Sequence, residues 1–210
     1  MFESDQISLF DTATGGARIG ELGAAVRRTN LSAGAWVDHC AGWVSGSDDV
    51  FTRLLHTVDW QRERRPMYDR VVDVPRLLRF YGADDPLPDP LLVDLRAALD
   101  AHYRSELGER FGTVGMCCYR DGADSVAWHG DTIGRGSTED TMVAIVSLGQ
   151  SRPLLLRPRA GGASRRYSLG HGDLLVMGGS CQRTWEHCVP KTTRPTGPRI
   201  SIQFRPQGVR

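Results

Sequence analysis

The strongest constraint on the fold of this chain is a change of sequence texture near Gly112. From there on, short apolar segments alternate with glycines, prolines and polar residues, a pattern typical of β-strands joined by tight turns. Seven segments are predicted strands: residues 113–119, 126–129, 142–148, 153–157, 165–169, 173–177 and 199–205. So many short, closely spaced strands predict a β-sandwich or a jelly-roll barrel, with one or two helices packed on its outside.

Two helices are predicted before that region. The longer one begins at Asp89, a good capping residue, and Pro90, which suits the first turn, and it ends at Gly108. A shorter amphipathic helix is predicted to follow Asp48 and Asp49. A chain of 210 residues is most simply one domain. We divide it into an N-terminal helical or extension region over residues 1–110 and a β-rich core over residues 111–210.

The last predicted strand carries two different faces. Its polar side chains alternate with apolar ones, so that one face holds Arg199, Ser201, Gln203 and Arg205 and the other holds Ile200, Ile202 and Phe204. The polar face could point to water or into the lumen of a barrel, and the alternation alone fits both. We favour the lumen, with the apolar face packed beneath a helix, because candidate metal ligands lie elsewhere in the same region.

Those candidate ligands are two histidines and an aspartate. His129 and Asp131 stand two residues apart, so both side chains leave the same face of an extended segment. His187 follows in sequence at a distance that suits a jelly roll, in which distant strands become neighbours. Two imidazoles and one carboxylate with open positions form a typical non-haem iron site. Arg199 and Arg205 would then suit a small molecule that bears carboxylates, because guanidinium groups bind carboxylates in a bidentate manner.

Charge is unevenly distributed along the chain although the net charge is only +1. Residues 152–210 carry 11 Lys and Arg against two acidic residues, and the preceding part is correspondingly acidic. One face could therefore bind a polyanion, although a bias toward arginine in the genome would explain the composition equally well.

Other features of the composition indicate a protein of the cytoplasm. No run approaches the roughly 20 apolar residues of a membrane span, and the N-terminal segment lacks the pattern of a signal peptide. Five cysteines without a framework pattern predict reduced thiols. Cys181 and Cys188 near His187 could suggest zinc, but Cys188 would face away from its neighbour His187 and Cys181 has no CxxC partner.

A set of short motifs appears in one order along residues 60–206. They are Tyr119-Arg120-Asp121-Gly122, His129-x-Asp131, Val146-Ser147-Leu148-Gly149, His171-Gly172-Asp173-Leu174-Leu175, Gly178-Gly179, Trp185-x-His187 and Pro198-Arg199 through Phe204-Arg205, preceded by Val74-Pro75-Arg76-Leu77 and Tyr81-Gly82. In this order and spacing the chain resembles the AlkB-like family of Fe(II)- and 2-oxoglutarate-dependent dioxygenases. The resemblance implies an α+β fold with a double-stranded β-helix (jelly-roll) core, supporting helices and an N-terminal base-recognition extension.

The resemblance also implies roles for individual residues. His129, Asp131 and His187 would bind Fe(II), and Tyr119, Arg199, Ser201 and Arg205 would bind the co-substrate 2-oxoglutarate. With O2, this machinery would hydroxylate a carbon attached to a base nitrogen in alkylated DNA or RNA, and the product would release free base and an aldehyde. A nucleotide-recognition lid is expected at about residues 56–85. Candidate substrate-pocket residues there are Trp60, Met67 and Tyr81, and candidate phosphate contacts are Arg62, Arg64 and Arg65.

The chain departs from the family pattern in its site. The family usually has Asn where this chain has Cys117 and Ser201, and the repair enzymes often follow His-x-Asp with acidic residues, where this chain has Thr132 and Ile133. Base preference is therefore open. The alternatives are the same machinery acting on a tRNA base, a protein or a small molecule, and a non-catalytic nucleic-acid-binding module on the same fold. We expect a monomer.

Overall fold

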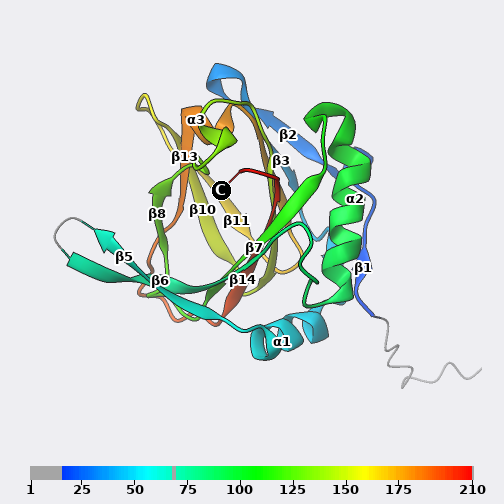
Figure 1. Ribbon diagram of the computed structural model, residues 1–210, viewed down its shortest axis with the longest axis vertical. Helices are drawn as coiled ribbons and strands as arrows, with labels where there is room; N and C mark the ends of the chain where they lie inside the picture. Colours follow the sequence, from blue (N-terminus) through cyan, green and yellow to red (C-terminus); the bar gives the residue numbers. More distant parts are fainter. Residues whose placement is uncertain (1–15, 68–69, 210) are drawn as a thin grey trace, which may run out of the picture.

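Two antiparallel β-sheets form the framework of the computed structural model, which describes residues 16–67 and 70–209 without the side chains of residues 65–72. The eight-stranded major sheet contains, in spatial order, β2 (Arg27–Asn30), β3 (Ala35–Cys40), β12 (Leu174–Gly179), β9 (Val143–Gly149), β14 (Arg199–Pro206), β7 (Phe111–Tyr119), β6 (Arg70–Tyr81) and β5 (Gln61–Met67). The four-stranded minor sheet contains β11 (Arg165–Leu169), β10 (Arg152–Pro158), β13 (Trp185–Val189) and β8 (Val126–His129). Together the sheets form the predicted jelly roll (Figure 1).

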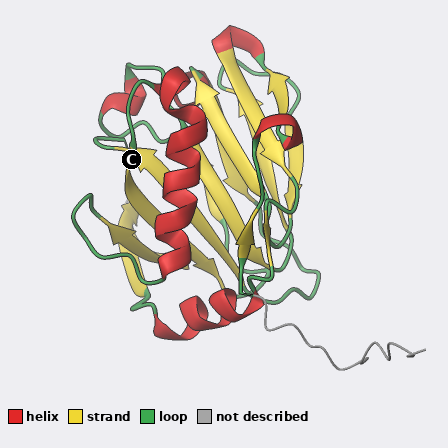
Figure 2. Cartoon of the chain, turned by 90° about the vertical axis from the view of Figure 1, so that its right-hand side faces the viewer, coloured by secondary structure: helices red, strands yellow, loops and turns green. Residues whose placement is uncertain are grey.

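Helices cover the outer face of the major sheet (Figure 2). Helix α2 (Pro90–Leu107) lies across it, and α1 (Asp48–Thr57) lies near one end of α2. Both match the sequence prediction. Asp89 caps α2 by accepting a hydrogen bond from the Leu91 amide at 3.0 Å, and Gly108 ends it with a φ of 78°, which glycine adopts without steric cost.

Smaller elements complete the chain. These are the short helix α3 (Cys181–Thr184), the two-stranded sheet of β1 (Arg18–Ile19) and β4 (Val44–Ser45), and the 3-10 turns η1 (Gly23–Ala25), η2 (Ser32–Gly34) and η3 (Arg135–Ser137). Within the described residues, no helix is long and apolar enough to cross a membrane.

Two apolar cores lie on opposite faces of the major sheet. The larger core fills the space beneath the helices and includes Ile200, Ile202 and Phe204 of β14, all fully buried. The second core lies between the two sheets. Because polar and apolar side chains alternate along β14, its polar face points between the sheets, as predicted for a barrel lumen. The fold thereby turns arginines inward where a surface strand would turn them to water.

Sequence reasoning found seven strands after residue 111 and missed the strands before it. The first 81 residues contribute β2, β3, β5 and β6 to the major sheet, so this region is richer in strands than the helical extension we expected. Strand β5 reads QRERRPM and shows no apolar alternation, because backbone pairing with β6 rather than burial of one face holds it in place. Strand β13 was also missed, because it is short and follows α3 directly.

Candidate metal centre and its pocket

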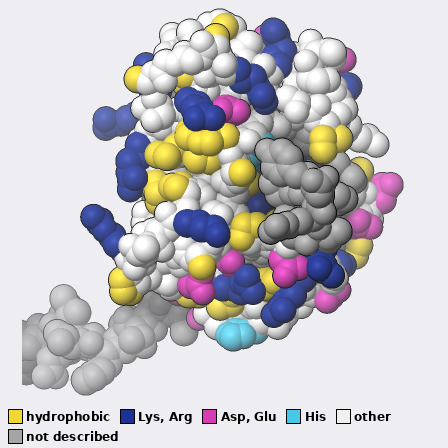
Figure 3. Space-filling view, turned by 90° about the vertical axis from the view of Figure 1, so that its left-hand side faces the viewer, with side chains coloured by type: hydrophobic (Ala, Val, Ile, Leu, Met, Phe, Trp, Pro, Cys, Tyr) yellow, Lys and Arg dark blue, Asp and Glu magenta, His cyan; other side chains and the backbone are white. Residues whose placement is uncertain are grey.

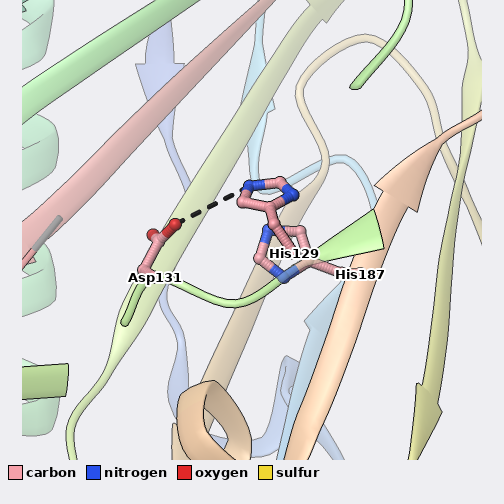
Figure 4. A group of neighbouring side chains, drawn as sticks. All are labelled: His129, Asp131 and His187. Carbon is pink, nitrogen blue, oxygen red and sulfur yellow. Dashed lines mark ion pairs between the residues drawn. The ribbon is translucent and has the colours of Figure 1, made fainter. Parts of the chain in front are cut away.

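The structure brings the three candidate metal ligands together. His129 ends β8, Asp131 follows it in the next loop, and His187 lies on β13 directly opposite His129 in the strand register. One ligand atom from each residue lies within 4.8 Å of the others. Figure 4 shows the two imidazoles and the carboxylate pointing toward one another. Two nitrogens and one oxygen in this arrangement fit Fe(II) and leave positions open for other ligands.

The electrostatics of the cluster favour the forms that bind a metal. Burial lowers the pKa of His187 to about 3, helped by its neighbour His129, whose own pKa burial also lowers. Burial would raise the pKa of Asp131, but Arg205 and the two histidines outweigh it and hold that pKa at about 2. His129 Nδ1 donates to the carbonyl oxygen of Ala127 at 2.9 Å, so its Nε2 carries the free lone pair. The cluster therefore offers two neutral imidazoles and one carboxylate.

A residue that sequence reasoning missed supports the loop between the ligands. The Asp131 amide donates to Gln182 Oε1 at 2.9 Å, and Gln182 is 1% exposed. The main chain of Gln182 also lies against Gly130, where an added Cβ would stand 2.2 Å from the Gln182 carbonyl oxygen. Gln182 thus contacts the residue between the ligands as well as Asp131 itself. Gln182 lies close to His187 in the sequence, and this proximity could have indicated its role near the metal ligands.

The inward face of β14 lines a pocket that continues from the metal cluster between the sheets. Arg199 is 1% exposed, and its Nε donates to Ser147 Oγ at 2.8 Å. Both of its Nη atoms lack a hydrogen-bond partner among the described residues, and its Cζ lies 5.4 Å from the Tyr119 ring centroid. An unpaired buried charge is costly, so this end of the pocket is suited to an anion.

The other predicted co-substrate residues line the same pocket. Arg205 Nε donates to Asp131 Oδ2 at 2.6 Å, so this arginine lies at the metal end while Arg199 lies at the far end. Ser201 Oγ accepts a hydrogen bond from Gln203 Nε2 at 2.7 Å, and the Cys117 thiol donates to Gln203 Oε1 at 3.8 Å. Gln203 therefore links the two positions at which this chain lacks the usual Asn.

Two predicted substrate-pocket residues lie on the other side of the sheet. Tyr81 is 7% exposed in the core beneath the helices, and Trp60 packs against that core with its indole N–H donating to the Leu55 carbonyl oxygen at 3.2 Å. Tyr81 faces away from the pocket because it pairs with Val114, whose side chain lies in the core beneath the helices. Among the described side chains of β6, Arg76 lines the pocket; it belongs to the Val74-Pro75-Arg76-Leu77 motif but was not among the substrate-pocket candidates. Met67 ends β5, and its side chain lies outside the described residues.

The remaining sequence candidates have simpler surroundings. Arg64 is paired with Asp73 at 3.2 Å, both well exposed, Arg62 is exposed on β5, and the Arg65 side chain lies outside the described residues. Burial raises the pKa of Cys181 to about 12, which favours its protonated thiol.

Comparisons with known proteins agree with this geometry. The family model of the 2OG-Fe(II) oxygenase superfamily matches residues 83–205. Alpha-ketoglutarate-dependent dioxygenase alkB homolog 3 of Bos taurus is 30% identical over 191 residues, covering 79% of this chain and 64% of that protein. DNA oxidative demethylase ALKBH2 of Arabidopsis thaliana is 34% identical over 135 residues, covering 53% and 42%. The chain thus spans less than two thirds of the length of these relatives.

Solved structures support the fold. A prolyl hydroxylase from Trichoplax adhaerens, in complex with a hypoxia inducible factor peptide, aligns with a TM-score of 0.58 at 14% identity, covering 80% of this chain and 83% of that one. A 2OG-Fe(II) oxygenase family oxidoreductase from Burkholderia pseudomallei aligns with a TM-score of 0.55 at 10% identity, covering 82% and 86%. With the family match over more than half of its residues, the chain belongs to the 2OG-Fe(II) oxygenase superfamily, and its relatives are AlkB-like proteins.

Proposed function

We propose that this protein is an Fe(II)- and 2-oxoglutarate-dependent dioxygenase that oxidatively demethylates alkylated bases in DNA or RNA. The observation that carries the proposal is one pocket lined at one end by His129 and His187 of the His-Asp-His cluster, and at the other by a buried arginine whose two Nη atoms have no hydrogen-bond partner among the described residues. A dicarboxylate can join the two ends, because one carboxylate can approach the metal while the other meets the arginine.

Each residue has a defined task in this proposal. His129, Asp131 and His187 hold the iron, Arg205 keeps Asp131 ionised and oriented, and Arg199 with Tyr119 binds the far carboxylate. When bound, iron and 2-oxoglutarate supply the oxidation: one oxygen atom of O2 enters succinate as CO2 leaves, and the other enters the methyl group, which departs as formaldehyde. The protein contributes ligation, orientation and exclusion of bulk water.

Nucleic acid is the substrate class that the surroundings favour. One relative is named a DNA oxidative demethylase. Figure 3 shows the side of the molecule where β8 and β13 lie; the charged side chains in its upper part are mostly Lys and Arg, and they surround a group of hydrophobic side chains. Such a surface attracts phosphates. A base within a duplex would have to leave the stack to reach the buried cluster. We also propose that the protein acts as a monomer in the cytoplasm, which light scattering and cell fractionation would test.

The decisive experiment measures succinate from purified protein with Fe(II), 2-oxoglutarate and O2. Single-stranded oligonucleotides carry N1-methyladenine, N3-methylthymine or no lesion, and His187→Ala is the control. Lesion-dependent succinate with restored base, lost in the variant, is the expected result. Succinate that ignores every lesion would redirect the search to a tRNA base, a protein or a small molecule. Bound iron without succinate under any condition would instead indicate a non-catalytic binding module.

A further inference from the structure

The segment that follows β14 lies against the loop that carries the metal ligand Asp131. We propose that this segment, residues 207–209, is a clamp that positions Asp131 for metal binding, with Val209 and Arg135 as its positioning residues. The inference rests on the metal centre of the proposed function. It adds to that centre two residues that lie outside both the ligand cluster and the sequence motifs.

Val209 anchors the clamp between the two sheets. Its side chain is 1% exposed and packs in the second apolar core. Its backbone forms an isolated antiparallel bridge with Gly134, three residues after Asp131. An added Cβ on Gly134 would stand 2.2 Å from the Gly208 carbonyl oxygen, so the loop and the segment meet main chain to main chain.

Gly136 links Val209 to the metal ligand. This buried glycine lies between the two: an added Cβ would stand 2.1 Å from the Asp131 carbonyl oxygen and 3.4 Å from Val209 Cγ1. A close-packed interior transmits small displacements to neighbouring groups. A change in the packing of Val209 should therefore reach the main chain of Asp131 through this contact.

Arg135 fastens the loop to the same segment by three hydrogen bonds. Its amide donates to the Gly208 carbonyl oxygen at 2.9 Å, and its Nε and Nη2 donate to the Gln207 carbonyl oxygen at 3.2 Å and 2.8 Å. The guanidinium also pairs with Glu109 at 2.8 Å and with Glu139 at 3.1 Å. Those two ion pairs are partly exposed and add little stability by themselves. The bonds to carbonyl oxygens are the ones that join the two segments.

The clamp is continuous with the strand that binds the Asp131 side chain. Arg205 of β14 donates to Asp131 Oδ2 at 2.6 Å, and the register of β14 with β7 shifts between Arg205 and Pro206, where the chain leaves the sheet. One stretch of chain thus holds Asp131 by its side chain and, through Val209, by its main chain. By thermodynamic linkage, a clamp that favours metal binding must itself be stabilised when the metal binds.

Val209→Ala and Val50→Ala are a matched pair of variants. Val50 is 4% exposed in the other apolar core, beneath the helices, so both changes remove two methyl groups from a packed interior and should lower stability in chemical denaturation. Electron paramagnetic resonance of free Mn(II) measures metal affinity. Val209→Ala should weaken Mn(II) binding about tenfold, the low end for groups outside the ligands, and Val50→Ala should leave it unchanged.

A second pair of variants tests the Arg135 contacts. Arg135→Gln removes the guanidinium that bonds to Gln207 and should weaken Mn(II) binding severalfold. Arg79→Gln, which breaks the ion pair with Asp59, is its control and should bind Mn(II) normally. In hydrogen exchange on the unmodified protein, Mn(II) should slow peptides that cover residues 132–138 and 206–209 but not those of α2. Val209→Ala should reduce that protection.

The possible failures differ from one another. Equal Mn(II) affinities in Val209→Ala, Val50→Ala and the unmodified protein would overturn the clamp and leave the metal centre standing. If Val209→Ala does not fold, the comparison of Arg135→Gln with Arg79→Gln decides, and equal affinities there would overturn the clamp. An unmodified protein that binds no Mn(II) would contradict the metal centre itself, and the proposed function would fail together with the inference.

Discussion

The two ends of the pocket differ in how their charges are balanced. At the metal end, Asp131 is paired with Arg205 and its amide is bound by Gln182, so the ligand loop is supported by the protein alone. At the far end, Arg199 is also buried, and among the described residues it makes a hydrogen bond through its Nε but none through its two Nη atoms. At the metal end, folding alone pairs the buried charge with a partner. At the far end, it leaves an uncompensated charge that an anionic ligand can neutralise.

The largest expected effect is a loss of stability when the arginine that neutralises Asp131 at the metal end of the pocket is removed. Arg205→Met would leave the buried Asp131 carboxylate unpaired, so the metal-free protein should lose about 3–5 kcal/mol of unfolding free energy. Chemical denaturation measures this. Arg183→Met is the control, because Arg183 pairs with Asp140 at the surface, where such a pair contributes about 1 kcal/mol or less. Equal losses in the two variants would contradict the difference in burial.

The same substitution, arginine to methionine, should not destabilise the ligand-free protein when it is made at the far end of the pocket. Arg199→Met removes an uncompensated buried charge, so the ligand-free protein should be as stable as before or more stable. Its affinity for 2-oxoglutarate should fall by about 2–5 kcal/mol, because the carboxylate of the ligand would then be buried without a partner. Thermal shift with and without 2-oxoglutarate and Mn(II) separates the two effects. A variant that still gains the full thermal shift from 2-oxoglutarate would show that Arg199 does not bind it.

A smaller effect tests the support of the metal loop. Gln182→Leu removes the acceptor for the Asp131 amide while keeping a similar volume, and affinity for Mn(II) should fall about 10- to 100-fold, as is usual when a partner outside the ligands is lost. Competition titration against a metal indicator measures it. Gln150→Leu makes the same change at an exposed position and should leave the affinity unchanged. Unaltered metal affinity in Gln182→Leu would mean that the loop is held by other contacts.

The smallest effect is a difference in reactivity between the cysteine that lines the pocket and the other four cysteines. Cys117 lines the pocket and is half-buried, whereas Cys40, Cys118, Cys181 and Cys188 are buried. Burial raises the pKa of Cys118 to about 11, which further suppresses its thiolate. Iodoacetamide should therefore label Cys117 first, as read by peptide mass spectrometry, and 2-oxoglutarate with Mn(II) should slow the labelling severalfold. Labelling that 2-oxoglutarate leaves unchanged would place the co-substrate away from Cys117.

Local patterns predicted much of this architecture. The alternation in residues 199–205, the Asp89-Pro90 start of α2 and the His129-x-Asp131 pair each act over a few neighbouring residues, so the sequence showed them directly. Strand β5, one of the strands missed before α2, reads QRERRPM; it shows no apolar alternation and is paired with β6.

The strand register explains why Tyr81 lies away from the pocket. On β6, Arg76 and Tyr81 are separated by an odd number of positions, so they face opposite sides of the sheet. Aromatic character suggested Tyr81 for the pocket, but pairing with β7 turns it into the core and turns Arg76 inward.

The sequence by itself determined the kinds of chemistry available: two imidazoles, a carboxylate and two arginines at spacings that place neighbours on one face. Only the tertiary structure decided which of these groups meet. Strand pairing places His129 opposite His187, and side-chain contacts join Arg205 to Asp131 and Gln182 to the ligand loop across long stretches of chain. It also decided that Arg199 is buried without a full set of partners, which depends on every strand around it. Local periodicity sets the direction of a side chain, whereas its partners and its solvation are set by the packing of distant segments.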